Sequence, residues 1–432
     1  MLIERNLENG FISEEELDFL CREALRKKNF KNQRLLVIIP DSTRTAPVGL
    51  FFRAICGELQ GVVKKLDFII ALGTHPPMDE ERIRRHLQIS EEEKNTKFKK
   101  VGIFNHQWDV SYNLAYMGTI SSEEIEKISD GLMSGDVPVY VNKKILDYDE
   151  LFIVGPVFPH EVVGFSGGYK YLFPGIAGPE IINKFHWLGA LITNPKINGV
   201  KDTPVREIIN RATSFIKIPI TLFCLVMRGD RVCGFYAGGE KAWEKACDLS
   251  SRVNIKYVDR TFRFVIAKAP LMYEDLWTAG KCMYKLEPVV EDGGTLIIYA
   301  PHVREVSYTH GEQIEKVGYH TRDYFLKQME KFKDVPGAIL AHCTHVKGIG
   351  VFHQGKEIPR INVILATGIP KERCQKINLG YIDPENVCIE DYMGREKEGI
   401  LVVEQAGETL YRLSSGKVPD IDELYKKFSF DL

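Results

Sequence analysis

Short runs of apolar, often β-branched residues alternate with amphipathic segments along most of the chain. Apolar runs of this length are typical of strands, and apolar positions spaced three and four apart are typical of helices that pack on a sheet. The predicted strands cover residues 35–39, 68–72, 101–105, 151–154, 264–267, 296–299 and 362–366. The predicted helices cover residues 14–27, 48–59, 123–132, 180–190, 204–215, 240–252 and 324–333. This alternation predicts an α/β fold with mainly parallel sheets flanked by helices.

A change near residue 259 divides the pattern into two parts. Asp259 and Arg260 stand between the end of one predicted helix and the start of a new strand. We therefore expect an N-terminal α/β domain over residues 1–258 and a C-terminal α/β domain over residues 259–432. The active site is expected in the cleft between the domains, and the last segment of the chain is free to pack back on the first domain.

The composition is that of a globular protein. The 432 residues are 44% hydrophobic and 27% charged, and the net charge of −2 without a basic tract argues against nucleic acid as a partner. The longest apolar runs, such as residues 220–227, are too short to span a membrane, and Glu4 and Glu8 interrupt any signal peptide. Nine cysteines without a C-x-x-C pair predict reduced thiols. We therefore expect a cytoplasmic protein with no membrane partner.

Chemically active side chains gather directly after four of the predicted strands. These segments are residues 41–44 (Asp-Ser-Thr-Arg), 73–75 (Gly-Thr-His), 155–160 (ending in His160) and 273–281 (Tyr273 to Lys281). Open α/β sheets bind ligands at the carboxyl ends of their strands, because the loops there meet the N-termini of helices. The four segments therefore predict the rim of an active site.

The glycine-rich segment 159–175 is the most informative stretch of the chain. Gly164, Gly167 and Gly168 permit backbone conformations that other residues avoid, and successive amides in such a loop can hold a phosphate. The spacing matches neither a Walker A loop nor G-x-G-x-x-G, so a simple turn is the alternative. Lys170 within this loop is suited to bind phosphate or to anchor a cofactor covalently.

Three histidines and an arginine are further candidates. His75 and His160 follow strand ends, and two imidazoles on opposite faces of one carbon would make a two-base racemising pair; structural hydrogen bonds are the alternative. His186 lies on a predicted helix, as a metal ligand or as a packed residue. Arg44 can bind a carboxylate or phosphate with its guanidinium fork, while Thr43 (with its neighbour Ser42) either binds phosphate or caps the next helix.

Lys281 and the remaining histidines are weaker candidates. Lys281 either reaches the cleft or lies solvated on a helix that begins near residue 274. A second histidine group resembles a metal cluster but has no zinc-site spacing, so we expect it at most to line the cleft. Its members are His302, His310, His342, His345 and His353. For His86, His106 and His320 we expect structural roles.

Together these motifs resemble the nickel-pincer lactate racemase family. The resemblance rests on D-x-T-R at 41–44, G-T-H at 73–75, P-H-x₃-G-F-S-G-G-x-K-x₃-P-G at 159–175, and a histidine sixteen residues beyond Lys170. It covers essentially the whole chain, including the two-domain plan. It implies a racemase or epimerase of a 2-hydroxy acid that acts by proton-coupled hydride transfer.

The resemblance also implies roles for individual residues. Lys170 would hold a nickel-pincer nucleotide covalently, His186 would bind the nickel, and His75 and His160 would exchange the hydroxyl proton. The cofactor-binding residues would be Asp41, Thr43, Arg44, Ser166, Gly167, Gly168 and Lys170, and the substrate-binding residues would be Arg44, Trp277, Thr278 and Lys281. Cofactor-biosynthesis proteins would be transient partners, and protein made without them would lack the cofactor.

One departure from the family pattern concerns the substrate. Lactate racemases carry a tyrosine–glutamine pair where this chain has Trp277 and Thr278. Because that position should touch the substrate, we expect a 2-hydroxy acid other than lactate. Two other functions are open on the residues alone. One is a zinc-dependent hydrolase that uses His75, His160 and His186 as ligands, and the other is a non-catalytic phosphate- or nucleotide-binding protein.

Overall fold

The computed structural model describes residues 2–428, which form two compact units. Within the described residues, unit 1 covers residues 2–158, 165–182 and 206–253, and unit 2 covers residues 159–164, 183–205 and 254–428. The last passage between them, at residues 253 and 254, lies five residues before the boundary expected at 258. The chain also enters unit 2 twice before that point. His160 and His186, expected in the N-terminal domain, lie on these two early segments.

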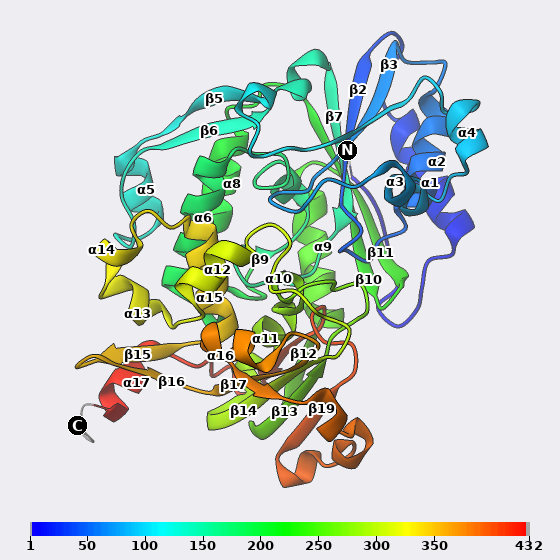
Figure 1. The fold of residues 1–432 in the computed structure, drawn as a ribbon. Coiled ribbons are helices and arrows are strands. Elements are labelled where there is room, and N and C mark those ends of the chain that lie inside the picture. The colour runs from blue at the N-terminus through cyan, green and yellow to red at the C-terminus, as the bar shows by residue number, and fades with distance from the viewer. Residues whose placement is uncertain (1, 429–432) are drawn as a thin grey trace. The chain divides into compact units, whose positions relative to one another are not determined.

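Unit 1 is built on a seven-stranded sheet (Figure 1). In sheet order its strands are β1 Ile3–Asn6, β11 Arg231–Gly238, β10 Ile220–Arg228, β7 Glu150–Pro156, β2 Arg34–Ile39, β3 Lys65–Ile70 and β4 Gly102–Asn105. From β10 to β4 all neighbours are parallel, and only β11 runs antiparallel to both of its neighbours. The prediction of mainly parallel sheets is therefore confirmed in this unit.

The helices of unit 1 cover the sheet as their apolar spacing dictates. Helix α1 (Glu14–Arg26) begins where the Ser13 hydroxyl accepts the amide of Glu16, and it buries Leu17, Cys21 and Leu25, which are spaced by four residues. These side chains and those of α2 (Val48–Leu59) share one core with one face of the sheet. On the other face lies α9 (Glu240–Val253), whose Leu249 occupies the space above the glycine at position 234.

One predicted helix of unit 1 is shorter than expected. Helix α5 (Ser122–Ile128) begins with a capping box between Ser121 and Glu124, but it ends four residues before the predicted end at 132. Asp130 and Gly131 adopt positive φ, which terminates a helix of L-residues. The other elements of this unit are α3 Glu80–Leu87, α4 Glu91–Asn95, η1 Ser111–Asn113, β5 Leu114–Ile120, β6 Val137–Asn142, η2 Lys143–Asp147 and η3 Gly168–Tyr171.

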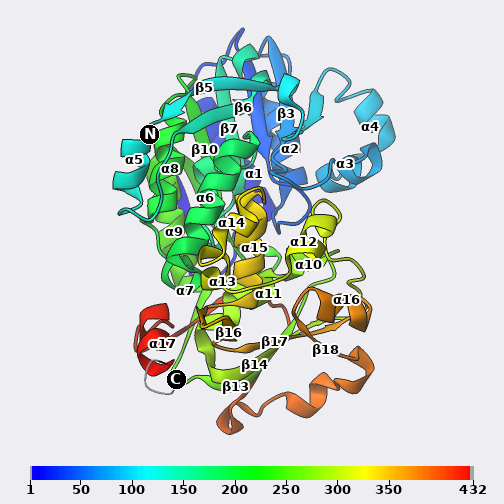
Figure 2. The same cartoon turned by 60° about the vertical axis from the view of Figure 1, so that its left-hand side comes forward.

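Unit 2 is built on a five-stranded sheet that is parallel throughout. In sheet order its strands are β18 Gly380–Ile382, β17 Asn362–Thr367, β14 Val290–Ala300, β13 Phe262–Lys268 and β19 Ile400–Val403. One side of the sheet is covered by helices, as Figures 1 and 2 show. These helices are α10 Leu276–Ala279, α11 Lys281–Leu286, α12 Gly311–Val317 and α15 Gly337–Lys347.

The last part of the chain returns to the start of unit 2. Strand β20 (Leu410–Leu413) pairs with β12 (Ile255–Val258), so residues after the main sheet lie beside residues that precede it. The other elements of unit 2 are β8 Pro159–His160, α7 Asn194–Ile197, η4 Glu287–Val289, α13 Arg322–Leu326, α14 Met329–Phe332, β15 Gly350–His353, β16 Lys356–Pro359, α16 Lys371–Lys376, η5 Pro384–Asn386, η6 Ile389–Tyr392, η7 Glu396–Glu398 and α17 Ile421–Phe428. Three elements, β9 Gly164–Phe165, α6 Pro179–Ile192 and α8 Pro204–Thr213, contain a passage between the units.

Two helix predictions in unit 2 are corrected by the structure. The single helix expected at 324–333 is two short helices, α13 and α14, and the break brings the rings of Phe325 and Phe332 to a centroid distance of 4.9 Å. The helix expected to begin near 274 begins at Leu276, capped by Asp275, and Gly280 separates it from the helix that starts at Lys281. Between residues 2 and 428, no helix is long and apolar enough to cross a bilayer.

Candidate functional site

Two neighbouring parallel strands of unit 1, β2 and β3, lead into Asp41 and His75. The His75 Nδ1 atom lies 2.5 Å from a carboxylate oxygen of Asp41. An ionised carboxylate only accepts hydrogen bonds, so Nδ1 of His75 carries a proton, and in the neutral form of the ring the lone pair is then on Nε2. Asp41 is buried, while about a quarter of the His75 side chain (27%) is exposed. His75 is thereby oriented to accept a proton at Nε2 from a partner on its open side.

The Asp41 carboxylate is itself held in place by Thr43. Both the backbone amide and the hydroxyl of Thr43 donate to the second carboxylate oxygen, at 3.1 and 2.8 Å. The alternative that Ser42 or Thr43 caps the next helix is wrong, because α2 starts after Pro47 and has no side-chain cap. The D-x-T motif thus serves to fix the carboxylate that orients His75.

The Lys170 loop lies beside this pair. Tyr171, at the end of η3, is buried, and burial raises its pKa. The Arg44 guanidinium and the Asp41 carboxylate are close enough to affect this pKa as well: the first lowers it and the second raises it. The amide of Gly73 also donates to the carbonyl of the glycine at 175, at 2.9 Å. The segments that carry Asp41, Arg44, His75 and Lys170 are therefore adjacent within unit 1, as the strand-end rule predicts.

The glycines of this loop are required by packing. Gly167 and Gly168 have φ of 80° and 56°. A Cβ on Gly167 would lie 2.6 Å from a methyl group of Val157, and one on Gly168 would lie 2.9 Å from the indole of Trp243. The Gly168 amide makes a hydrogen bond to the sulfur of Cys224. Burial raises the pKa of this thiol, and the bond from Gly168 lowers it. Phosphate binding by these amides stays a prediction.

Two residues that the sequence did not single out, Trp243 and Arg206, donate hydrogen bonds to the backbone of this loop. The Trp243 indole N–H donates to the Ser166 carbonyl at 2.9 Å, and the Arg206 guanidinium donates to the Phe165 carbonyl. Arg206 also stacks on Trp243, 4.1 Å from the ring centroid. The Ser166 hydroxyl accepts the amide of Phe158 and donates to the backbone at position 156, so it is engaged inside the loop.

In unit 2, His160 is buried at the end of β8. Its Nδ1 accepts the backbone N–H of Val162 at 3.1 Å and lies 3.3 Å from the Glu161 carboxylate. The ammonium group of Lys285, which is also buried, donates to the carbonyl of Pro159. The sequence did not single out Glu161 or Lys285, and a lysine in an apolar helix gives no signal of a partner far away in the chain.

His186 on α6 lies near His342 on α15. Burial lowers the pKa of His342 well below its ordinary value, and the imidazoles of His345, His310 and His186 lower it further. The Tyr284 and Tyr319 hydroxyls bond to the two ring nitrogens of His342, at 2.8 and 3.0 Å. Of the second histidine group, His342 is therefore near enough to the predicted nickel ligand to interact with it electrostatically.

The predicted substrate residues of unit 2 differ in how far they are engaged. The Trp277 ring packs against that of His342, with centroids 4.1 Å apart and the ring planes tilted by 31°. The Thr278 amide and hydroxyl both donate to the Asp275 carboxylate, at 3.0 and 2.6 Å. The buried Thr278 hydroxyl is therefore engaged by Asp275, the residue that caps the start of α10. The Lys281 ammonium lies 4.6 Å from the ring centroid of Tyr273. Of the substituted pair, Trp277 is thus the partly exposed member.

The histidines for which we expected structural roles make internal bonds. His86 bonds to the carbonyl of Pro40, directly before Asp41, and burial lowers its pKa. His106 bonds to the carbonyl at position 177, and burial lowers its pKa to about 4. His320 lies 2.7 Å from Glu357. His86 is thus a support of the Asp41 segment.

The described residues do not offer a complete ligand set for a bare metal ion. Among residues 2–428, no group of three or more histidine, cysteine, aspartate or glutamate side chains could hold a metal. The zinc-site interpretation of His75, His160 and His186 therefore gains no support. A single protein imidazole such as His186 fits a metal complex that brings most of its own donors, which is the arrangement implied for a nickel-pincer nucleotide.

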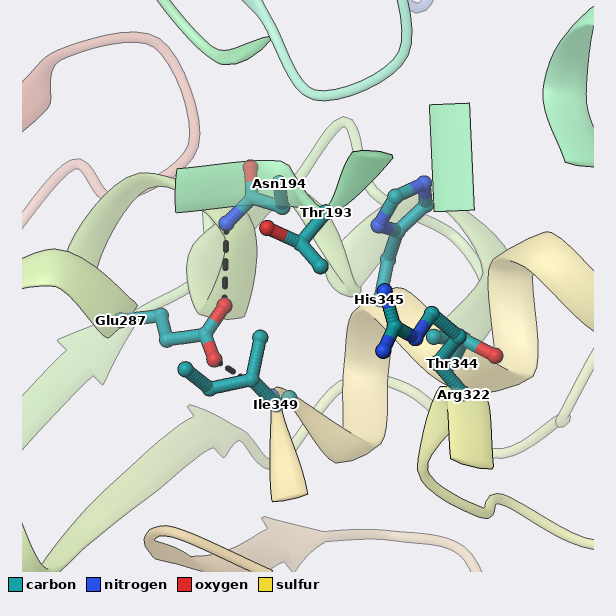
Figure 3. Close-up of a pocket in the computed structure, with 8 residues that line it drawn as sticks. Thr193, Asn194, Glu287, Arg322, Thr344, His345 and Ile349 are labelled. Atoms are coloured by element: carbon teal, nitrogen blue, oxygen red, sulfur yellow. Dashed lines mark hydrogen bonds between the residues drawn. The ribbon is translucent and has the colours of Figure 1, made fainter. Parts of the chain in front are cut away.

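A small cavity lies at the end of α6 in unit 2 (Figure 3). The side chains around it are Thr193, Asn194, Glu287, Arg322, Thr344, His345 and Ile349. Glu287 accepts from Asn194 at 3.0 Å and from the amide of Ile349 at 2.7 Å. Burial raises the pKa of Glu287. Of the residues that line the cavity, the sequence singled out only His345, as a member of the second histidine group.

Comparison with known proteins gives a consistent assignment. The profile described as "Lactate racemase N-terminal domain" matches residues 11–198. The lactate racemase of Thermoanaerobacterium thermosaccharolyticum is 26% identical over 308 residues, and that of Lactiplantibacillus plantarum is 21% identical over 304 residues. Each alignment covers 69% of this chain and 65% of the relative, so the chain spans about two thirds of the curated relatives it matches.

Solved structures agree with the observed fold. A Thermotoga maritima protein of known crystal structure is 34% identical, with a TM-score of 0.86 over 94% of this chain and 100% of that chain. The lactate racemase apoprotein of T. thermosaccharolyticum is 19% identical, with a TM-score of 0.68 over 95% of this chain and 94% of that chain. The second match shows the fold alone, and it supports the α/β architecture described above.

Proposed function

Because the chain belongs to the lactate racemase family, we propose that it is an isomerase that racemises or epimerises a 2-hydroxy acid. The observation that carries this proposal is the His75–Asp41 pair at the ends of β2 and β3. A neutral imidazole with its Nδ1–H on a buried carboxylate is suited to take a hydroxyl proton at Nε2. Arg44, next to Asp41 in the chain, is suited to bind the substrate carboxylate with its guanidinium fork.

The proton chemistry is assigned to two histidines. In one direction His75 Nε2 removes the hydroxyl proton, and the Asp41 carboxylate stabilises the positive charge that the ring acquires. His160 supplies the proton when the hydroxyl group is restored on the other face. In the opposite direction the two residues exchange these tasks, so both are needed for each complete inversion.

The cofactor is proposed to be a nickel-pincer nucleotide. Lys170 would hold it covalently, His186 would be the protein ligand to nickel, and Asp41, Thr43 and the glycine loop would lie along it. When bound, this group supplies a site that takes the C2 hydride and returns it. The chain's own contribution is to hold the loop rigid through Trp243 and Arg206, and to orient the acid–base residues.

The substrate is proposed to be a 2-hydroxy acid other than lactate, since Trp277 replaces the tyrosine of lactate racemases. A change of one such contact alters discrimination by about 10–200-fold. In a panel of enantiopure 2-hydroxy acids, lactate should be a poor substrate or none. If lactate inverts faster than every larger member of the panel, Trp277 does not govern selection.

The test uses protein made together with the cofactor-biosynthesis proteins. Substrate deuterated at C2 should invert and keep its deuterium in ordinary water, because the hydride does not exchange with solvent. Complete loss of the label would eliminate hydride transfer. Protein that carries the Lys170 adduct and inverts no member of the panel would overturn the proposed function itself.

A further inference from the structure

Lys285 is a buried lysine that contacts a distant backbone segment of unit 2. It lies on the short helix α11 and is 3% exposed. Lysine is almost never buried to this degree unless its ammonium group has a partner, because the charge loses its hydration when it leaves water. Here the ammonium donates to the backbone carbonyl of Pro159, 126 residues earlier in the chain. This contact joins α11 to the segment that carries His160.

The carbonyl that Lys285 binds belongs to the peptide group that leads into His160. A peptide group is planar, so the Pro159 carbonyl and the nitrogen and Cα atoms of His160 lie in one plane. Holding the carbonyl therefore restricts where the side chain of His160 can lie. Strand β8 contains only these two residues, and proline donates no ladder hydrogen bond. A strand of this kind gains much of its definition from contacts outside it.

A second contact holds the ring of His160 itself. Its Nδ1 accepts the backbone N–H of Val162 at 3.1 Å. This bond limits rotation of the ring, whereas the bond from Lys285 limits movement of the backbone that carries the ring. His160 is 5% exposed, so bulk water competes little for these contacts. The two bonds together define the direction of the other ring nitrogen, Nε2.

Helix α11 is held firmly at the residue before Lys285. The Tyr284 carbonyl accepts from the side-chain amides of Asn194 and Asn198, each at 3.1 Å. The Tyr284 hydroxyl bonds to Nδ1 of His342 at 2.8 Å. All of these residues belong to unit 2. The backbone and the side chain of Tyr284 are therefore both fixed, and the ammonium of Lys285 extends from a rigid support.

A lysine at position 285 is costly for the helix that carries it. Lys281 lies four residues earlier, and residues four apart share one face of a helix. Like charges at this spacing destabilise a helix. The residues at 282, 283, 284 and 286 are all buried, so an apolar side chain at 285 would match its neighbours. A buried lysine that stability does not favour indicates a use for its hydrogen bond.

We propose that Lys285 is a positioning residue for His160. By holding the Pro159 carbonyl, its ammonium group fixes the backbone from which the His160 imidazole meets the hydroxyl group of the substrate. The consequence for turnover rests on the proposed function, because it needs His160 as one of the two acid–base residues. The effect on the geometry of His160 does not rest on it, so the two can be tested separately.

Lys285→Met tests the bond, with Lys347→Met as the matched control. Methionine keeps a long unbranched side chain and removes the donor. Lys347, at the end of α15, is partly buried and also donates to a backbone carbonyl, that of Asn378 at 2.6 Å, which leads into no candidate site residue. In protein without cofactor, Lys285→Met should raise the exchange rate of the Val162 amide at least about tenfold. It should also shift the NMR signals of the His160 ring nitrogens, and Lys347→Met should change neither.

The effect on turnover is measured in protein that carries the cofactor. The kcat of Lys285→Met should fall by about 10²-fold, because a displacement of about 1 Å in a reacting group costs that much. KM should stay within about twofold, since Lys285 acts on the backbone and not on the substrate. Lys347→Met should keep both values. If Lys285→Met does not fold, Lys285→Gln takes its place in each measurement, because its amide ends one bond short of the ammonium.

Unchanged ring signals and amide exchange in Lys285→Met would overturn the proposal, as would an equal response in Lys347→Met. Changed ring signals with an unchanged kcat would overturn the role of Lys285 in the reaction. If the ring signals change but the parent protein inverts no 2-hydroxy acid, the positioning of His160 is supported and the proposed function fails.

Discussion

The two histidines proposed to move protons sit in opposite surroundings. In unit 1, Nδ1 of His75 faces the Asp41 carboxylate, and the ring is partly exposed. In unit 2, Nδ1 of His160 accepts a backbone N–H from Val162, and the ring is buried. The first arrangement places the proton on Nδ1 and leaves Nε2 as an acceptor. The second places the proton of a neutral ring on Nε2 and makes that atom a donor.

This difference teaches that the pair is not symmetric at rest. In the proposed mechanism, with His75 as acceptor and His160 as donor, the protein would be prepared for one direction of inversion. The Glu161 carboxylate, 3.3 Å from the same nitrogen of His160, is placed to stabilise the charged ring when His160 takes a proton in the other direction. The variants below test this comparison, beginning with the one that should abolish inversion whichever histidine starts the cycle.

Lys170→Ala should have the largest effect. If the cofactor is held only through this lysine, the variant should lose the covalent adduct and all inversion, whichever histidine starts the cycle. Intact mass and peptide mapping of protein made with the cofactor-biosynthesis proteins measure the adduct. Lys241→Ala, at an exposed position of α9, is the control and should keep both. Full activity in Lys170→Ala would contradict the anchoring role.

His75→Ala and His160→Ala should each reduce inversion by about 10²–10⁴-fold in both directions. The reason is that a complete cycle uses one residue as acid and the other as base. Initial rates from each enantiomer measure the loss. A variant that fails in one direction only would show that a solvent molecule replaces the missing histidine, and would break the proposed pairing.

The variants Asp41→Asn and Glu161→Gln test the surroundings of His75 and of His160 one at a time. The side-chain amide that Asp41→Asn introduces can donate to Nδ1 of His75 and so reverse its tautomer, and we expect a loss of about 10²-fold or more. Glu161→Gln leaves the Val162 N–H in place, and we expect a loss below about tenfold. Nitrogen–proton NMR spectra of the imidazoles read the tautomers directly. Equal losses in the two variants, with unchanged tautomers, would contradict the asymmetry.

Trp243→Phe should have the smallest effect on chemistry and a measurable effect on the loop. It keeps a ring against Gly168 but removes the N–H that satisfies the Ser166 carbonyl. We expect a loss of about 1–3 kcal/mol in the free energy of unfolding. Amides 165–170 should also exchange faster. Trp108→Phe is the control, and an equal response in both variants would show that the indole bond does not hold the loop.

Much of unit 1 could be predicted from its sequence. The strands before Asp41 and His75 are apolar runs buried on both faces of a parallel sheet, so their composition alone marks them. The closeness of Asp41, His75 and Arg44 follows from the rule for strand ends. The helix end at Ile128 could have been read from Asp130-Gly131, a pair suited to positive φ.

The supports of the site could not be predicted in the same way. Trp243 and Lys285 act on carbonyls 77 and 126 residues away, and such pairs leave no local pattern. The same holds for the early segments of unit 2. Residues 159–164 and 183–205 stand in the chain among elements of unit 1, and only contacts with residues after 254 assign them to unit 2.

That interleaving has a consequence for how the chain acquires its structure during synthesis. The side-chain amides of Asn194 and Asn198 are buried and donate to the carbonyl of Tyr284, 90 and 86 residues later. At about 5–20 residues per second, the ribosome needs on the order of 4–18 s to make that partner. During this interval the side-chain amides of Asn194 and Asn198 lack the Tyr284 carbonyl to which they donate in the folded protein. If the gene is divided near residue 258, the Asn194 and Asn198 side chains and the Tyr284 carbonyl are made on separate chains. The two halves should then fold only when they are present together.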